Sequence, residues 1–317
     1  MNTEVRVAVC SRSFSKNLVL RKELLTKYEN VTFNDSGAQL EGEELIKFLQ
    51  DHDKAITALE TINEDILIKL PELKVIAKYG VGLDMIEMEA MRNYDVRLGW
   101  VGGVNRRSVS ELVIAFAVNM LRYVGVANNE VRSGIWRQLM GGQLSGRTIG
   151  IIGCGHVGKD LVKLLEPFGC KVLVNDILDY PDFYKLHNIE TVSLPELMAN
   201  SDVVSVHVPL NESTCGILNR EILSLMKSSA ILINVARGGL VDELALKEML
   251  KNKLLAGAAF DVFAAEPPLD SELLLLPNFL ATPHIGGSSE EAVLAMGRAA
   301  IKGLEINSLP EINHQLT

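Results

Sequence analysis

The sequence has few cysteines, no excess of basic residues and no long hydrophobic run, and each absence argues against a class of protein. Its four cysteines, Cys10, Cys154, Cys170 and Cys215, include no close pair. We therefore expect reduced thiols in a cytoplasmic protein, with no disulfide and no metal site. The net charge of −9 argues against a nucleic-acid or anionic-membrane partner. The longest apolar run, Leu112–Val118, is far shorter than the ~20 residues that span a bilayer.

The length and the N-terminus also limit the possibilities. The first ten residues contain no basic segment followed by an apolar core, so we expect no signal peptide. A chain of 317 residues is too long for one comfortable core, which predicts two domains. A Gly-rich and then basic segment, 99–108, places the boundary near residue 100.

Short apolar runs alternate with helical patterns along the whole chain. Most of these runs are continuously apolar, which is typical of parallel strands covered by helices on both faces. Strands separated by helices predict βαβ units and therefore a doubly wound α/β fold with parallel sheets. The predicted strands are 5–10, 55–59, 73–79, 148–153, 171–176, 203–209, 230–236, 257–263 and 279–284.

A long apolar helix is predicted after the boundary. Ser108 and Glu111 have the spacing of a capping box, which predicts that the helix begins at Ser108. The segment 134–150 is predicted to be a loop that enters a strand. We expect the helix and this loop, which contains Trp136, to contribute to a homodimer, because they carry more apolar surface than one domain should leave exposed.

A glycine-rich turn follows the predicted strand 148–153. Gly153, Gly155 and Gly158 have the G-x-G-x-x-G spacing, a helical pattern comes next, and the following strand ends at Asp176. In this context the spacing predicts a Rossmann dinucleotide-binding turn, with the phosphates at the helix N-terminus. Asp176 would accept hydrogen bonds from the ribose hydroxyls and repel a 2′-phosphate, which favours NAD over NADP. A purely structural glycine turn is the alternative.

Three later strands each end in a polar residue that suits catalysis. Arg237, the pair Asp261 and Glu266, and His284 follow successive strands. The carboxyl ends of parallel strands meet at one edge of a sheet, where ligands bind. Taken singly, such an arginine is more often a surface ion pair, such a glutamate a solvated residue, and such a histidine a turn residue.

Several segments, in order, resemble the D-isomer-specific 2-hydroxyacid dehydrogenase family, which includes the D-3-phosphoglycerate dehydrogenases. The resemblance implies a Rossmann NAD-binding domain at 100–287 and a discontinuous, flavodoxin-like substrate domain at 1–99 plus 288–317. It further implies that the chain stops before the regulatory domain that many phosphoglycerate dehydrogenases append. The segments that carry it are LETINEDIL, KYGVGLDMIEMEA, GGVNRRSVSEL, GIIGCGHVG, VHVPLNEST, NVARGGLVDE, DVFAAEP and TPHIGG.

The resemblance implies a catalytic set of Arg237, Glu266 and His284, and the chemistry of the reaction supports it. Oxidation of a 2-hydroxy acid requires a hydride to leave C2 and a proton to leave O2. A guanidinium can clamp the substrate carboxylate, so Arg237 is also assigned to substrate binding. His284 is the general base for oxidation and the general acid for reduction, and Glu266 orients its ring.

The resemblance also implies the remaining cofactor contacts. Asp261 would contact the nicotinamide carboxamide, whereas His207 and Val208 would line the adenine side. A packed core residue is the alternative for His207. The predicted cofactor-binding residues are Gly153, Gly155, His156, Val157, Gly158, Asp176, His207, Val208, Pro209, Val235, Ala236, Asp261, Gly286 and Gly287.

On the substrate side, the loop KYGVG resembles the family segment whose backbone N–H groups bind the substrate carboxylate. A tight turn is the alternative for this loop, and solvent exposure is the alternative for Lys78. The predicted substrate-binding residues are Lys78, Gly80, Val81, Gly82, Asn105 and Arg237. Arg106 and Arg107 would be available for a distal phosphate, with a solvated helix N-terminus as the alternative.

The sequence leaves the substrate open. Whole-chain resemblance favours 3-phosphoglycerate slightly, but the segment TALETINED has no basic residue where phosphoglycerate-oxidising members often carry arginine. An unphosphorylated acid, as for a glyoxylate or hydroxypyruvate reductase, is the alternative. An NAD-sensing binding protein like the C-terminal-binding-protein corepressors, or an enzyme of the same fold that oxidises formate or phosphonate, is a further alternative.

Overall fold

The computed structural model describes residues 1–311, and the chain divides into two compact units. The first unit contains Met1–Asn105 and the segment that begins at Ser289, and the second contains Arg106–Ser288. The predicted domain ranges differ from these units only at residues 100–105 and 288.

The first unit is built on a five-stranded sheet with the order β2-β1-β3-β4-β5, in which all neighbours are parallel. This order is the flavodoxin-like one, and its switch point lies between β1 and β3. The strands are β1 (Asn2–Val9), β2 (Tyr28–Phe33), β3 (Lys54–Thr57), β4 (Val75–Lys78) and β5 (Arg97–Gly99). The helices are α1 (Arg12–Lys16), α2 (Leu18–Leu25), α3 (Gly42–Leu49), α4 (Glu64–Leu67), α5 (Met88–Asn93) and α14 (Glu290–Gly303).

Both faces of this sheet are buried, which explains its continuously apolar strands. Successive residues of a strand point to opposite faces. Ala8 therefore joins a different core cluster from Val7 and Val9. Helix α14 closes the second face through Ala300 and Ile301, so the C-terminal part of the chain returns to the first unit.

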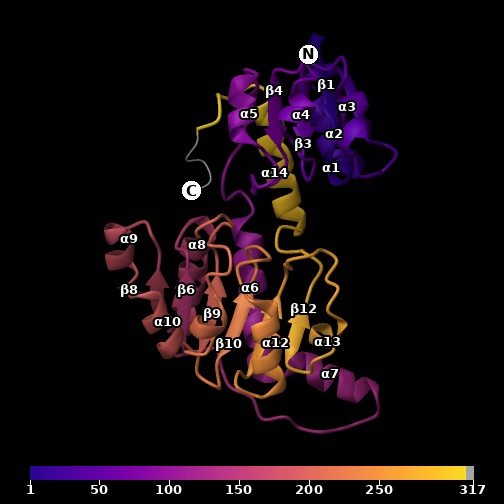
Figure 1. Cartoon of the computed structure of the whole chain (residues 1–317). Coiled ribbons are helices and arrows are strands. Elements are labelled where there is room, and N and C mark those ends of the chain that lie inside the picture. The colour runs from indigo at the N-terminus through magenta and orange to yellow at the C-terminus, as the bar shows by residue number, and fades with distance from the viewer. Residues whose placement is uncertain (312–317) are drawn as a thin grey trace. The chain divides into compact units, whose positions relative to one another are not determined.

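The second unit is a seven-stranded parallel sheet with the order β12-β11-β10-β9-β6-β7-β8 (Figure 1). This is the Rossmann order with one extra edge strand, and its switch point lies between β6 and β9. The strands are β6 (Thr148–Ile152), β7 (Lys171–Asn175), β8 (Glu190–Thr191), β9 (Val203–Val206), β10 (Ile231–Asn234), β11 (Gly257–Phe260) and β12 (Phe279–Ala281). The helices are α6 (Arg106–Arg122), α7 (Val124–Arg132), α8 (His156–Leu165), the 3₁₀ turn Glu166–Phe168, α9 (Pro181–Leu186), α10 (Leu194–Asn200), α11 (Arg220–Leu223), α12 (Glu243–Lys251) and α13 (Ser271–Leu274).

All nine predicted strands are present, and the doubly wound α/β class is confirmed. Three strands were not predicted: β2, β5 and β8. Each lies at the edge of its sheet. β2 is exposed at three of its six residues and β8 at both of its residues, so neither has the continuous apolar run of a central strand.

The predicted start of the long apolar helix is wrong. Helix α6 begins at Arg106, and Ser108 lies inside it, where its hydroxyl donates a hydrogen bond to the Gly286 carbonyl at 2.6 Å. The apolar face of α6 is buried within its own unit through Val113 and Phe116, so it is not bare. Within residues 1–311 no single helix is long and apolar enough to cross a membrane, although α6 and α7, bent by 62°, meet the criteria of length and composition as a pair.

Candidate active site

The glycine turn after β6 has the close backbone contacts that its spacing predicts. Gly153 has φ = +93°, and a Cβ there would lie 2.9 Å from the backbone carbonyl carbon of His207. A Cβ on Gly158 would lie 2.4 Å from the Gly153 oxygen. Only glycine fits at either position, because the turn, α8 and the end of β9 meet there without room for a side chain.

Gly155 differs from the other two, and it indicates that a dinucleotide fits here. It is the N-cap residue of α8, and a Cβ there would have no atom within 4 Å. The turn therefore leaves open space at the N-terminus of a ten-residue helix, where unsatisfied N–H groups and the positive end of the helix dipole favour a phosphate. His156 and Val157 form the first turn of this helix.

Asp176 follows β7 directly and lies against the glycine turn. One carboxylate oxygen accepts a hydrogen bond from the Cys154 N–H, and the other accepts one from the Leu178 N–H at 2.8 Å. These bonds fix the carboxylate beside the turn, where the ribose of a dinucleotide would lie. Burial, with a contribution from Asp176, raises the pKa of the Cys154 thiol to about 12, so this thiol stays protonated and inert.

His207 continues β9 toward the same turn, followed by Val208 and Pro209. Its ring is half-buried and its Nε2 lies 2.8 Å from the Ser205 hydroxyl. Burial lowers the pKa of His207 to about 3, so the ring is neutral at physiological pH. A neutral, packed ring is compatible with both interpretations of His207, a core residue and a residue that lines the adenine side of the cofactor site.

The turn after β10 positions Arg237. The buried amide of Asn234 donates to the Arg237 carbonyl at 2.8 Å and accepts from the Ala236 N–H at 3.1 Å. Gly238 lies so close to the β11 turn that a Cβ would be 1.9 Å from the Phe263 carbonyl. Asn234 and Gly238 were not predicted, although an asparagine that ends the run ILIN was a visible signal.

His284 and Glu266 form the pair that the sequence predicts. The Nδ1 atom of His284 lies 2.8 Å from Oε2 of Glu266, and both side chains are partly exposed. Oε1 of Glu266 accepts a second hydrogen bond, from the Phe263 N–H at 3.2 Å. The two carboxylate oxygens therefore tie the ring of His284 to the backbone of the β11 turn.

Asp261 holds the loop that carries His284. It is 1% exposed. Its oxygens accept hydrogen bonds from the Thr282 hydroxyl at 2.5 Å and from the N–H groups of Ile285 and Gly286, both at 2.7 Å. His284 adopts φ = 54°, a left-handed conformation that is uncommon for a non-glycine residue and persists where surrounding contacts fix it. Contact of Asp261 with the nicotinamide stays a prediction.

The predicted substrate loop belongs to the first unit. Gly80 has φ = +122°, and the Val81 carbonyl accepts a hydrogen bond from the Trp100 indole at 3.0 Å, so the loop is a fixed turn at the end of β4. Lys78 is only 6% exposed, and its ammonium donates to the Ala58 carbonyl, so the solvent-exposed alternative for Lys78 is wrong. The buried Oδ1 of Asn105 has no hydrogen-bond partner within residues 1–311.

The two arginines considered for a distal phosphate lie at the start of α6, in the second unit. Arg107 forms an ion pair with Asp160 of α8 at 3.0 Å, and Asp160 is 8% exposed. This ion pair joins α6 to α8, so the guanidinium of Arg107 already has a carboxylate partner within the second unit.

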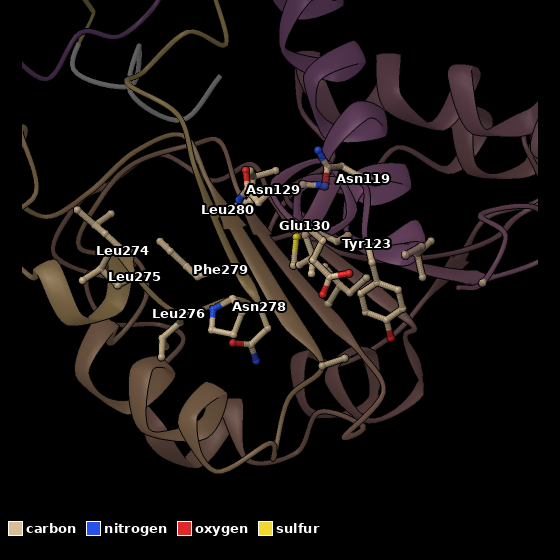
Figure 2. A pocket seen from close by; sticks show the side chains of 18 of the residues that line it. Asn119, Tyr123, Asn129, Glu130, Leu274, Leu275, Leu276, Asn278, Phe279 and Leu280 are labelled. Carbon is tan, nitrogen blue, oxygen red and sulfur yellow. The ribbon is translucent and has the colours of Figure 1, made fainter. Parts of the chain in front are cut away.

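A cavity lies away from these groups. It measures about 680 Å³, and the side chains around it come from α6, α7, α13 and β12 (Figure 2). Its wall includes Ile231, Ala256 and Phe279, which lie at or next to the first residues of β10, β11 and β12. The cavity is therefore at the amino ends of these strands, opposite the carboxyl edge that carries the glycine turn and His284.

The glycine turn, Arg237, Glu266 and His284 thus all lie at the carboxyl edge of one parallel sheet, which is where a dehydrogenase with a Rossmann domain binds its dinucleotide. The family model described as D-isomer specific 2-hydroxyacid dehydrogenase, NAD binding domain, matches residues 114–286. The chain belongs to this family, as the sequence motifs predicted. A nicotinamide dinucleotide is accordingly the cofactor of the second unit.

Individual relatives agree with this membership. Hydroxypyruvate reductase of Thermotoga maritima is 36% identical over 268 residues, 81% of this chain and 85% of that protein. D-3-phosphoglycerate dehydrogenase of Methanocaldococcus jannaschii is 35% identical over 282 residues, and the chain spans only 54% of its length. The solved structure of a D-2-hydroxyisocaproate dehydrogenase has a TM-score of 0.81 at 27% identity and covers 95% of each chain.

The neutral state of His207 predicts a loss of stability in acid. The unfolded chain takes up a proton on this ring below about pH 6.5, whereas the folded chain does so only near pH 3. The contribution of His207 is therefore complete above pH 6.5 and is lost as the pH falls toward 3. By pH 5 the loss in free energy of unfolding should amount to at most ~2 kcal/mol. This value is an upper bound because the ring is half-buried.

When thermal unfolding is followed between about pH 7 and pH 4.5, the melting temperature of His207→Gln should fall less than that of the unmodified chain. Ser205→Ala removes the hydroxyl partner but keeps the titrating ring, so it serves as the control and should retain the acid-induced loss. Parallel curves for His207→Gln and the unmodified protein would show that this ring is not a buried neutral group.

Proposed function

We propose that the chain is an NAD-dependent dehydrogenase that interconverts a small D-2-hydroxy acid and the corresponding 2-oxo acid. The observation that carries the proposal is the hydrogen-bonded pair of His284 and Glu266, held at the carboxyl edge of a sheet whose domain belongs to an NAD-binding family. The chain spans about half the length of the D-3-phosphoglycerate dehydrogenases it matches and most of the length of the hydroxypyruvate reductase.

The proposed chemistry follows from the way the two side chains are bonded. When bound, the nicotinamide accepts or supplies the hydride at C2 of the substrate. The Nδ1–H of His284 donates to Glu266, which leaves Nε2 to take the proton from the C2 hydroxyl in oxidation and to return it in reduction. The Glu266 carboxylate orients the ring through this hydrogen bond. Arg237 binds the substrate carboxylate as a guanidinium clamp.

We propose that the cofactor is NAD in preference to NADP, with Asp176 as the discriminating residue. Its carboxylate is fixed beside the glycine turn by two backbone N–H groups, so a ribose 2′-phosphate would meet a negative charge that cannot easily turn away. We also propose a cytoplasmic location, because the thiols among the described residues are unpaired.

We propose a homodimer formed through the segment 133–147 between α7 and β6, called the arm below. Trp136 is 86% exposed and Met140 is 94% exposed, although both side chains are large and apolar. The arm adjoins the 680 Å³ cavity, whose lining includes Ile135. A two-fold symmetric contact would let each arm cover the apolar surface of the other copy.

Light scattering at micromolar concentration should give twice the chain mass, and Trp136→Ser should shift the mass toward that of the monomer. The mass should shift because Trp136→Ser removes the aromatic area that Trp136 would bury at the interface. Leu186→Ser, at an exposed apolar residue of α9 that does not line this cavity, provides the comparison and should have less effect. A monomer for the unmodified chain would refute the dimer.

The catalytic assignment predicts different kinetic effects at its members. His284→Ala should lower kcat by ~10²–10⁴-fold while leaving NADH affinity nearly unchanged, because it removes the proton transfer and not a cofactor contact. Arg237→Ala should also raise KM, since it binds the substrate in both the ground and the transition state. NADH oxidation with glyoxylate, hydroxypyruvate, pyruvate and 3-phosphohydroxypyruvate measures both effects. Near-native turnover of both variants on the best substrate would contradict the assignment.

The cofactor assignment predicts that Asp176→Ser weakens NAD binding and narrows the preference over NADP. Loss of a charged hydrogen bond to the ribose implies ~1.5–3 kcal/mol, or roughly tenfold or more in kcat/KM. Asp179→Ser removes a nearby negative charge from the same loop and is the matched control, for which we expect little change. An unchanged NAD/NADP ratio of kcat/KM in Asp176→Ser would place this carboxylate away from the ribose.

A further inference from the structure

The turn after β11 carries Glu266 and is exposed over three successive residues. Ala264, Ala265 and Glu266 are all exposed, whereas Phe263, directly before them, is buried in the core of the second unit. An exposed turn that contains two alanines buries little surface of its own, so its position depends on the hydrogen bonds of its backbone. The partners of those N–H groups therefore show what holds Glu266 in place.

Two carboxylates accept hydrogen bonds from consecutive N–H groups of this turn. The Phe263 N–H donates to Oε1 of Glu266 at 3.2 Å, and the Ala264 N–H donates to Oε1 of Glu243 at 2.8 Å. The first bond is local, because Glu266 belongs to the turn itself. The second bond joins the turn to α12, which begins at Glu243, 21 residues before Ala264 in the chain. Glu243 is therefore the residue that connects the turn to another element.

The backbone that carries Glu243 is itself fixed. Asp242, the N-cap residue of α12, donates its N–H to the Leu218 carbonyl at 3.0 Å and accepts from the Ala245 N–H through its side chain at 2.9 Å. Ala245 and Leu246 are completely buried, so the first turn of α12 is packed in the core. The carboxylate of Glu243 therefore projects from a rigid position, and its bond to the Ala264 N–H is charge-assisted.

The peptide group between Phe263 and Ala264 also contacts the turn that carries Arg237. A Cβ on Gly238 would lie 1.9 Å from the Phe263 carbonyl and 2.3 Å from the Ala264 nitrogen, so the two backbones touch directly. Gly238 and Glu243 both belong to the segment that leads from β10 into α12. This one segment therefore packs against the peptide group and also binds its N–H.

We propose that Glu243 is a positioning residue for the pair of Glu266 and His284. The carboxylate of Glu266 bonds the Phe263 N–H with one oxygen and Nδ1 of His284 with the other, so a displacement of the turn that carries Glu266 also displaces its bond to the ring. Glu243 prevents that displacement through the adjacent Ala264 N–H, and it contacts neither substrate nor cofactor in the proposed mechanism. The inference rests on the proposed function. The alternative role of Glu243 is a favourable charge at the N-terminus of α12.

The test measures kcat and KM of NADH oxidation with the best 2-oxo acid. Glu243→Ala should lower kcat by about tenfold and leave the KM for NADH unchanged, because the acid–base pair loses its orientation and the cofactor contacts stay. Glu243→Gln keeps an oxygen acceptor for the Ala264 N–H but removes the charge, so it should keep kcat within about twofold. A helix-charge role predicts the opposite, an equal loss in both variants. Glu221→Ala, in the first turn of α11, is the matched control and should leave kcat unchanged.

A double-mutant cycle shows whether Glu243 acts through Glu266. In the background of Glu266→Ala the residue to be positioned is absent, so adding Glu243→Ala should lower kcat by less than about twofold. Effects of the two substitutions that multiply would mean that Glu243 acts independently of Glu266 and would overturn the inference.

Amide hydrogen exchange, followed by NMR, separates this inference from the proposed function. The Phe263 N–H bonds Glu266 and not Glu243, so faster exchange there reports that the whole turn has loosened. Glu243→Ala should speed this exchange by about tenfold, and Glu243→Gln should leave it nearly unchanged. If the unmodified chain reduces no 2-oxo acid, the proposed function fails and the exchange alone decides whether Glu243 holds the turn. Unchanged exchange of Phe263 in Glu243→Ala, or an equal loss of kcat in both variants, overturns the inference and leaves the dehydrogenase intact.

Discussion

The buried carboxylate of Asp261 is the interaction on which the geometry of the candidate active site depends. A carboxylate that is 1% exposed needs hydrogen-bond donors in place of the water it has lost. Asp261 meets this requirement with three donors from the segment Thr282–Gly286, each of which is charge-assisted and therefore stronger than a neutral bond. The same bonds hold His284 in a left-handed backbone conformation that the residue alone would disfavour. The hydrogen bonds of Asp261 therefore both hold the loop Thr282–Gly286 in place and position His284, the proposed acid–base residue.

Close backbone contacts at glycine bring the rest of the site to the same edge. Gly153 meets the end of β9, and Gly238 meets the turn after β11. Each contact lets turns from neighbouring strands touch directly, with no side chain between them. The side chains proposed to be catalytic therefore project from turns whose backbones are mutually fixed, which is the arrangement that a short-range proton transfer would require. Glu266 completes it, because its second oxygen bonds the backbone of the turn that Gly238 touches.

The sequence predicted the central strands, the glycine turn and the pairing of His284 with Glu266, because each depends on local pattern or on the rule that parallel strands end at one edge. It did not predict three of the four edge strands, β2, β5 and β8, since an edge strand is half-solvated and often lacks a continuous apolar run. It placed the start of α6 wrongly, because a Ser-x-x-Glu spacing occurs equally well inside a helix. The Gly286 carbonyl that Ser108 bonds is 178 residues away, which no local pattern reveals.

Charged side chains were the least predictable part, for a physical reason. Lysine and arginine are long, so the partner of each is set by the tertiary fold and not by its position in the chain. Lys78 was considered as a substrate ligand and Arg107 as a phosphate ligand, yet the first is buried on the Ala58 carbonyl and the second is paired with Asp160. Glu60 was not singled out from the sequence, where its segment, TALETINED, was noted only for having no basic residue. Its carboxylate accepts from the N–H of Ala58, whose carbonyl accepts from the ammonium of Lys78, so two opposite charges from different strands bond to one residue, an arrangement that no local sequence pattern reveals.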